Sequence, residues 1–150
     1  MNKTVKLGDG PEVSRIGYGT MQLPGKGVWG ESEDPAGAVE VLRKAVDLGI
    51  DFFDTADSYG PFVAEDLLRE ALHPYDGITV ATKAGLVRTG PGQWHQIGRP
   101  EYLRFALEMS LRRLGVDQID LFQLHRIDSQ VPAEEQIGVL KDMKDEGKIN

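Results

Sequence analysis

The chain alternates short β-branched segments with longer segments whose apolar residues recur at helical spacing, and this alternation constrains its fold most strongly. We expect strands within 15–19, 50–54, 78–82 and 119–124, and helices within 32–49, 62–72, 100–114 and 132–147. Strands separated by helices of this length pair in parallel through right-handed crossovers. Turn-forming residues around Gly8-Asp9-Gly10-Pro11 predict a hairpin over 4–14. The expected architecture is a hairpin followed by four strand–helix units.

Two α/β architectures fit this order of elements, an open doubly wound sheet and a (β/α) barrel. The string after the first strand reads Gly17-Tyr18-Gly19-Thr20-Met21-Gln22, which lacks the Gly-x-Gly-x-x-Gly of dinucleotide-binding open sheets. The barrel is therefore favoured, and the open sheet stays as the alternative. The stretch from 84 to 98 has no regular pattern and is longer than most connections, so we expect an irregular functional loop there.

Composition narrows the classes of function. The 150 residues suffice for one domain, and 40% hydrophobic with 27% charged residues is typical of a soluble globular protein. A formal net charge of −7 argues against nucleic acid as the main partner, because phosphate contacts need clustered Lys and Arg. The absence of cysteine excludes disulfides and thiolate chemistry. We see no signal peptide and no apolar run of about 20 residues, so we expect a cytoplasmic protein that does not bind membranes.

Four side chains that can carry chemistry lie at or just past the ends of the predicted strands. Asp54 closes the second strand, Lys83 the third and His125 the fourth, while Tyr59 follows the second strand. Each one alone has an ordinary interpretation as a turn former, a loop tyrosine, a solvated lysine or a buried histidine. The carboxyl ends of parallel barrel strands face one mouth, so we expect the four to converge there.

Together these residue types suit the reduction of an aldehyde or ketone by an external hydride. Tyrosine alone is a poor proton donor at neutral pH, and a neighbouring ammonium group favours its phenolate form. A carboxylate would keep the lysine charged and oriented, and a neutral histidine can donate a hydrogen bond to a carbonyl oxygen. Another barrel enzyme that uses Lys83 as a Schiff base is a weaker alternative. We expect no metal ion.

Four separated motifs resemble those of the aldo-keto reductase family, and the resemblance runs from Val5 to Ile149. The motifs are the strings DFFDTADSYG at 51–60, VATK at 80–83, RLG at 113–115 and IDLFQLHR at 119–126. The resemblance implies a (β/α)8 TIM barrel with an N-terminal hairpin and an NADPH-dependent carbonyl reductase. It also implies that Tyr59 is the general acid, that Lys83 tunes the pKa of Tyr59, that Asp54 partners Lys83, and that His125 orients the substrate.

The same resemblance suggests where a cofactor and a substrate would bind. Thr20 and Met21, after the first strand, and Asp54 match positions at the nicotinamide end of the cofactor. The loop 19–30 is similar to a branch that includes pyridoxal reductases. Trp29 and Trp94 are expected either to wall a pocket for a small carbonyl substrate or to pack against a helix.

The resemblance covers only the first half of a barrel. We expect a single domain over 1–150, with the hairpin at 1–14 and four β/α units at 15–149, whereas a complete barrel typically needs about 250 residues. The family places most of its cofactor contacts in the other half, so a non-catalytic half-barrel module with an inherited tetrad is the alternative function. Open strand edges favour pairing, and we expect a homodimer in which the fourth strand lies beside the partner's first strand.

Overall fold

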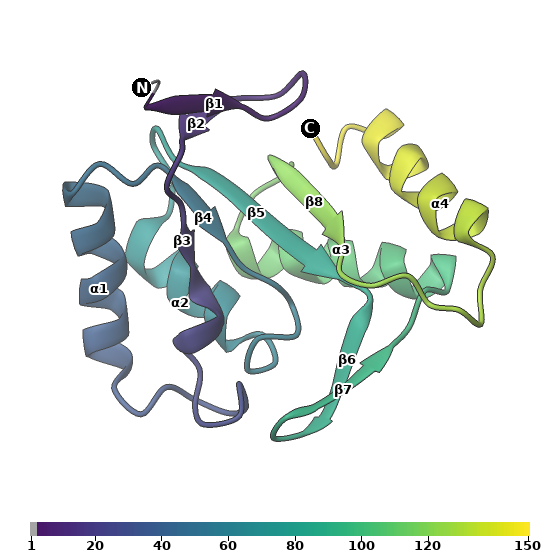
Figure 1. Cartoon of the computed structure of the whole chain (residues 1–150), viewed down its shortest axis with the longest axis horizontal. Helices are drawn as coiled ribbons and strands as arrows, with labels where there is room; N and C mark the ends of the chain where they lie inside the picture. Colours follow the sequence, from purple (N-terminus) through teal and green to yellow (C-terminus); the bar gives the residue numbers. More distant parts are fainter. Residues whose placement is uncertain (1–2) are drawn as a thin grey trace.

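Four short parallel strands form the centre of the computed structural model, which describes residues 3–150 (Figure 1). Their spatial order follows the chain: β3 (Tyr18–Gly19), β4 (Phe52–Asp54), β5 (Thr79–Ala84) and β8 (Leu121–Leu124). The register places Gly19 opposite Asp54 and Lys83 opposite Gln123. A doubly wound sheet reverses its strand order at a switch point, whereas this sheet winds in one direction only. The fold is therefore a partial (β/α)8 barrel, as the sequence predicted.

Four helices connect or follow these strands: α1 (Pro35–Asp47), α2 (Val63–Leu72), α3 (Pro100–Leu114) and α4 (Ala133–Asp145). α1 begins at Asp34, whose side chain accepts a hydrogen bond from the Gly37 amide at 2.9 Å, with Pro35 at the first helical position. α3 ends at Gly115, whose φ of 74° is the left-handed conformation that glycine adopts without strain. The predicted helix positions are confirmed to within a few residues at each end.

The apolar core lies between the sheet and the helices. Phe53 of β4 and Leu42, Leu68, Leu107 and Met143 of the four helices are all fully buried in it. Burial of side chains of this size stabilises the fold by roughly 1.5–3 kcal/mol each. In Figure 1, α2 and α3 lie behind β4, β5 and β8, and α1 and α4 flank the sheet on either side. This arrangement leaves the other face of the sheet without a helix among the described elements.

Two antiparallel hairpins accompany the sheet. β1 (Thr4–Lys6) pairs with β2 (Glu12–Ser14), as predicted, and the Ser14 amide donates to the Asp51 carboxylate at 2.8 Å. β6 (Leu86–Gly90) pairs with β7 (Gln93–Gln96) where we expected an irregular loop, so that expectation is wrong. Pro91-Gly92, with Gly92 at a φ of 68°, turns the chain between β6, which contains the β-branched Val87 and Thr89, and β7, which contains Trp94. This turn signal is present in the sequence.

The first strand also differs from expectation. We predicted a buried strand over 15–19, but only Tyr18 and Gly19 pair, and Ile16 is 73% exposed. Among the described residues β3 pairs with β4 alone, so β3 forms an edge of the sheet. On the opposite side, the segment before β8 is joined by the last residues of the chain through a parallel bridge between Ile119 and Ile149. No helix within residues 3–150 is long and apolar enough to cross a membrane.

Candidate functional site

The carboxyl ends of the strands bring the four predicted side chains together. Asp54 is the last residue of β4, Lys83 is the penultimate residue of β5, and His125 directly follows β8. The segment after β4 continues along β5, with the Thr55 amide donating to the Ala81 carbonyl and the Asp57 amide to the Lys83 carbonyl. This continued pairing carries Tyr59 back over the end of β5.

Gly60 allows the chain to turn sharply after Tyr59. Its φ of 118° is a conformation that other residues rarely adopt, and a Cβ there would lie 2.5 Å from Cβ of Val63. The turn leads directly into α2, which begins at Val63. The conformation of Gly60 therefore sets the direction in which the chain leaves Tyr59 and enters α2.

Lys83 is the hub of the site. Its ammonium group donates to Asp54 Oδ2 at 2.6 Å, to the Thr55 carbonyl at 2.7 Å and to Tyr59 Oη at 3.3 Å. All three of its protons are therefore used, and the lysine itself is only 9% exposed. Because Lys83 donates to the phenolic oxygen, the hydroxyl proton of Tyr59 remains available to another acceptor.

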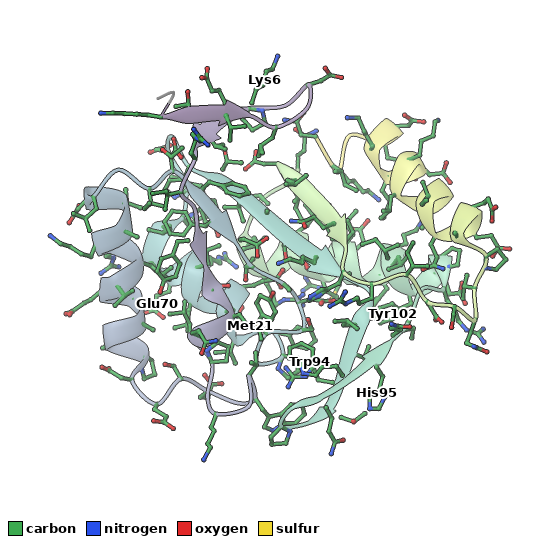
Figure 2. All side chains as sticks on the ribbon, in the orientation of Figure 1. Lys6, Met21, Glu70, Trp94, His95 and Tyr102 are labelled. Atoms are coloured by element: carbon green, nitrogen blue, oxygen red, sulfur yellow. The ribbon has the colours of Figure 1, made fainter. Side chains whose placement is uncertain are left out.

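Tyr59 is held by ring contacts as well as by Lys83. Its ring meets those of His125 and Trp94 edge to face, with centroids 5.9 Å and 6.5 Å away. Tyr59 is 6% exposed and packs with Ala56 and Ala64 in a small apolar cluster beside the main core. Trp94 thus lies beside the tyrosine, and in Figure 2 it occupies the side of β7 opposite His95.

His125 is held as a neutral imidazole. Burial, with the neighbouring charges of Lys83 and Arg126, lowers the pKa of His125 to about 4. Nδ1 lies 3.3 Å from the Ser58 hydroxyl, and the His125 amide donates to the Ala84 carbonyl at 2.8 Å. The direction of this hydrogen bond depends on the imidazole tautomer: in the tautomer protonated at Nε2, Nδ1 accepts from Ser58 and Nε2 is a hydrogen-bond donor.

Of the three residues expected to contact a cofactor, Asp54 belongs to the tetrad, and the other two, Thr20 and Met21, differ in exposure. Thr20 is fully buried, and its hydroxyl donates to the Asp54 carbonyl at 3.2 Å, which ties the loop after β3 to the site. Met21 is 40% exposed and lines an open cleft of about 370 Å³ with Lys26 and Asp34. The structure therefore places Thr20 beside Asp54, whereas Met21 lines a separate cleft that includes none of the four tetrad residues.

The segment between Asp54 and Tyr59 also contains unpaired polar atoms. Within residues 3–150, Thr55 Oγ1 and Asp57 Oδ1 are buried without a hydrogen-bond partner. Burial, reinforced by the negative charge of Glu65, raises the pKa of Asp57 well above its usual value, against opposing effects from Arg113 and Lys83. Burial therefore makes the Asp57 carboxyl harder to ionise than a carboxyl in water.

A second buried ion pair lies on the helix side of β5. Glu65 of α2 is fully buried and accepts from Thr82 Oγ1 and from Arg113 Nε, both at 2.6 Å. The Arg113 guanidinium also donates to Ser110 Oγ at 3.2 Å and lies 4.2 Å from the centre of the Phe62 ring. This pair links α2, β5 and α3.

Sequence reasoning missed several polar residues around the tetrad, chiefly Gln123, Ser58 and Arg88. Gln123 donates to Asp54 Oδ1 at 3.2 Å. Side chains two residues apart in a strand point to the same face, so the position of Gln123 two residues before His125 could have predicted that it lies beside the site. Ser58 has no comparable signal, because its role depends on the turn before Tyr59. Among residues 3–150 no three His, Asp or Glu side chains are grouped as a metal site would require.

The fold and the site together define a partial (β/α)8 barrel with a Lys–Asp–Tyr–His cluster at the carboxyl end of its strands. The chain belongs to the aldo/keto reductase family, whose profile matches residues 15–150.

Named relatives agree with this assignment. The chain is 54% identical over 146 residues to an uncharacterized oxidoreductase of Schizosaccharomyces pombe, covering 97% of this chain and 47% of that protein. It is 41% identical over 144 residues to pyridoxine 4-dehydrogenase of Escherichia coli, covering 91% and 50%. An aldo-keto reductase structure from Bacillus halodurans in its holo form superposes with a TM-score of 0.83 at 34% identity, covering 98% and 48%. The chain thus spans about half the length of the relatives it matches.

Proposed function

We propose that this chain carries the proton-transfer machinery of an NADPH-dependent reductase of aldehydes and ketones. One observation carries the proposal: Lys83 Nζ donates both to Asp54 at 2.6 Å and to the Tyr59 hydroxyl oxygen at 3.3 Å. A phenol beside a buried cation can release its proton, because the cation stabilises the phenolate that remains. Membership of the aldo/keto reductase family supports an oxidoreductase role.

Each side chain has a role in this proposal. Tyr59 donates its hydroxyl proton to the carbonyl oxygen of the substrate as that oxygen becomes an alcohol. Asp54 keeps Lys83 charged and oriented, and neutral His125 donates a hydrogen bond from Nε2 to the same carbonyl oxygen. The Tyr59 and His125 rings pack edge to face with centroids 5.9 Å apart, so both residues lie at the same mouth of the barrel.

The residues present fit the nicotinamide end of a reduced cofactor. Asp54 offers a partly exposed carboxylate, with 35% of its side chain exposed, and Thr20 fixes the neighbouring main chain. A contact between Met21 and the nicotinamide rests on the family resemblance alone. When bound, the cofactor supplies the hydride that adds to the carbonyl carbon. NADPH rather than NADH, and a cytoplasmic location, stay predictions from the resemblance and the sequence.

Titration of the 150-residue chain with NADPH tests the proposal, with cofactor fluorescence and tryptophan quenching as readouts. We expect saturable but weak binding, because the family places most of its cofactor contacts in the other half of the barrel, followed by turnover of a carbonyl panel. The panel includes pyridoxal, because the chain is similar to a protein named pyridoxine 4-dehydrogenase. The control is Tyr59→Phe, which keeps the ring and removes the proton. Binding by Tyr59→Phe without turnover supports the proposal, and absence of binding by the unchanged chain contradicts it.

A second candidate is a half-barrel that associates with a second copy of itself, for which the exposed apolar flanks are the specific observation. Val41 of α1 is 47% exposed, Leu48 directly after α1 is 73% exposed, and Ile137 of α4 is 57% exposed. The chain exposes 8422 Å² at 16.5 kDa, about 900 Å² above the roughly 7,500 Å² of a compact monomer of this mass. This excess is close to the roughly 800 Å² per partner of a stable interface.

Sedimentation analysis tests this association. We expect a dimer that Leu48→Glu converts to a monomer. Phe105→Glu is the matched control, because Phe105 is 58% exposed on α3 rather than on an outer helix, so this variant stays dimeric. A monomeric unchanged chain that unfolds cooperatively contradicts the association.

A further inference from the structure

Arg88, on β6, ties three separate segments together through main-chain carbonyl groups. Its Nη1 donates to the carbonyls of Val28 at 2.5 Å and Ser58 at 2.9 Å. Its Nη2 and Nε donate to three further carbonyls: Gly27 at 2.8 Å, Gly90 at 3.4 Å and Gln93 at 2.8 Å. All five N–H groups of the guanidinium are therefore used.

Aromatic rings enclose the same guanidinium. Its central carbon lies 3.6 Å from the centre of the Trp94 ring and 5.8 Å from that of Trp29. No carboxylate within residues 3–150 lies within 4 Å of Arg88, so main-chain dipoles and indole faces hold this cation in place of an anion. An arginine that stabilised only the β6–β7 hairpin would bind carbonyl groups within that hairpin. Three of the five hydrogen bonds of Arg88 instead go to the loops after β3 and β4.

Ser58 connects this arrangement to the proposed chemistry. Its carbonyl accepts from Arg88, its hydroxyl lies 3.3 Å from His125 Nδ1, and the next residue in the chain is Tyr59. Trp94, stacked on the guanidinium, presents its edge to the Tyr59 ring with centroids 6.5 Å apart. Arg88 thus reaches Tyr59 through both the main chain and an aromatic ring, without contacting the tetrad itself.

We infer that Arg88 is a positioning residue for the Tyr59–His125 pair: it fixes the Ser58 main chain and the Trp94 ring against which the two side chains are set. The effect of Arg88 on catalysis rests on the proposed function. The structural role of Arg88 rests on the contacts above. Lysine cannot replace it fully, because an ammonium group has three donors and no plane to stack on an indole.

The test compares Arg88→Met and Arg88→Lys with two controls in the full 150-residue chain. Thr89→Val alters the same hairpin on its exposed side, and Arg104→Met removes an arginine whose partner is Glu146. The first readout is the ring chemical shifts of His125 by NMR, assigned with His125→Gln. The second is acrylamide quenching of Trp94 in a Trp29→Phe background.

We expect Arg88→Met to move the His125 ring signals and to increase quenching of Trp94, Arg88→Lys to give smaller changes, and both controls to match the parent chain. Where the parent turns over a carbonyl substrate, kcat of Arg88→Met falls by about 10–100-fold, because small misplacements of reacting groups are costly. KM changes by less than about threefold, since substrate binding itself does not involve Arg88.

The outcomes separate the inference from the proposed function. If the parent chain has no turnover, the proposed function fails, while the NMR and quenching data still decide whether Arg88 positions the pair. A folded Arg88→Met whose His125 and Trp94 signals equal those of the parent overturns the inference. So does failure of both Arg88 variants to fold, because Arg88 would then be a folding residue.

Discussion

Thr82 and Lys83 are neighbours on β5 and belong to two different polar groups on opposite faces of the sheet: Thr82 donates to the buried Glu65–Arg113 pair, and Lys83 pairs with Asp54. On the helix face, both oxygens of Glu65 are engaged, by Thr82 and Arg113, and its side chain is fully buried. On the other face, the Lys83–Asp54 pair leaves 35% of the Asp54 side chain exposed and extends to the Tyr59 hydroxyl. The first pair is closed, and the second ends on a group that can exchange a proton.

This difference follows from the two-residue period of a strand, which sends successive side chains to opposite faces. One strand can therefore support stability on its helix face and chemistry on its other face within two residues. The variants below test this division, because each should affect mainly one face.

The largest effect is expected for Arg113→Met. It leaves the Glu65 carboxylate fully buried without its cation, and breaking a buried pair in this way costs about 3–5 kcal/mol. This loss approaches the whole stability of many domains, so urea unfolding should show a greatly lowered midpoint. Glu65→Gln with Arg113→Met together should recover part of the loss, and no recovery would mean that the pair does not act as a unit.

Lys83→Met should affect mainly the chemistry. Without the ammonium group no cation stabilises the Tyr59 phenolate, and we expect turnover to fall by about 10²–10³-fold. Unfolding should change less than for Arg113→Met, because Asp54 keeps contact with solvent and with Gln123. Steady-state kinetics and urea unfolding of the same preparation check both statements, and equal stability losses for the two variants would remove the proposed division.

The titration of His125 should make the stability of the folded chain depend on pH. Its pKa is about 4 in the folded chain and about 6.5 unfolded, so the unfolded state binds the proton first. Stability should therefore fall as pH drops from about 6.5 towards 4, by at most about 2 kcal/mol after solvent screening of a partly exposed group. His125→Gln should flatten this part of the curve measured by urea unfolding, and an unchanged slope would contradict the assignment.

Asp57→Asn should have the smallest effect on stability, and it should increase stability where Arg113→Met and Lys83→Met decrease it. The pKa of Asp57 is raised in the folded chain, so the contribution of Asp57 to stability is present below its unfolded pKa of about 4 and is lost as pH rises. Asparagine resembles the neutral carboxyl and cannot ionise. We expect it to stabilise the chain by up to about 1 kcal/mol at pH 7, with the gain disappearing near pH 4, and a destabilised Asp57→Asn would show that the carboxylate is used.

Sequence reasoning could bring the four tetrad side chains to one place because Asp54, Lys83 and His125 lie at or next to strand ends, which composition and spacing mark, and Tyr59 follows one of them closely. It could not place Arg88 or Glu65, because their partners are main-chain carbonyls and helix side chains that come together only in three dimensions. It misread 84–98 because Pro91-Gly92 was taken as part of an irregular stretch rather than as a hairpin turn. Ile16 was taken as buried because apolar character alone does not show which strand lies at an edge.

The spatial order of the strands, which repeats their order in the chain, has a consequence for synthesis on the ribosome. Each strand pairs with a strand that is synthesised before it: β4 pairs with β3, β5 with β4, and β8 with β5. Because synthesis proceeds from the N-terminus, each of these strands emerges from the ribosome after the strand with which it pairs. Asp54, Tyr59 and Lys83 can therefore meet before β8 is translated, and His125 is the last of the four to arrive.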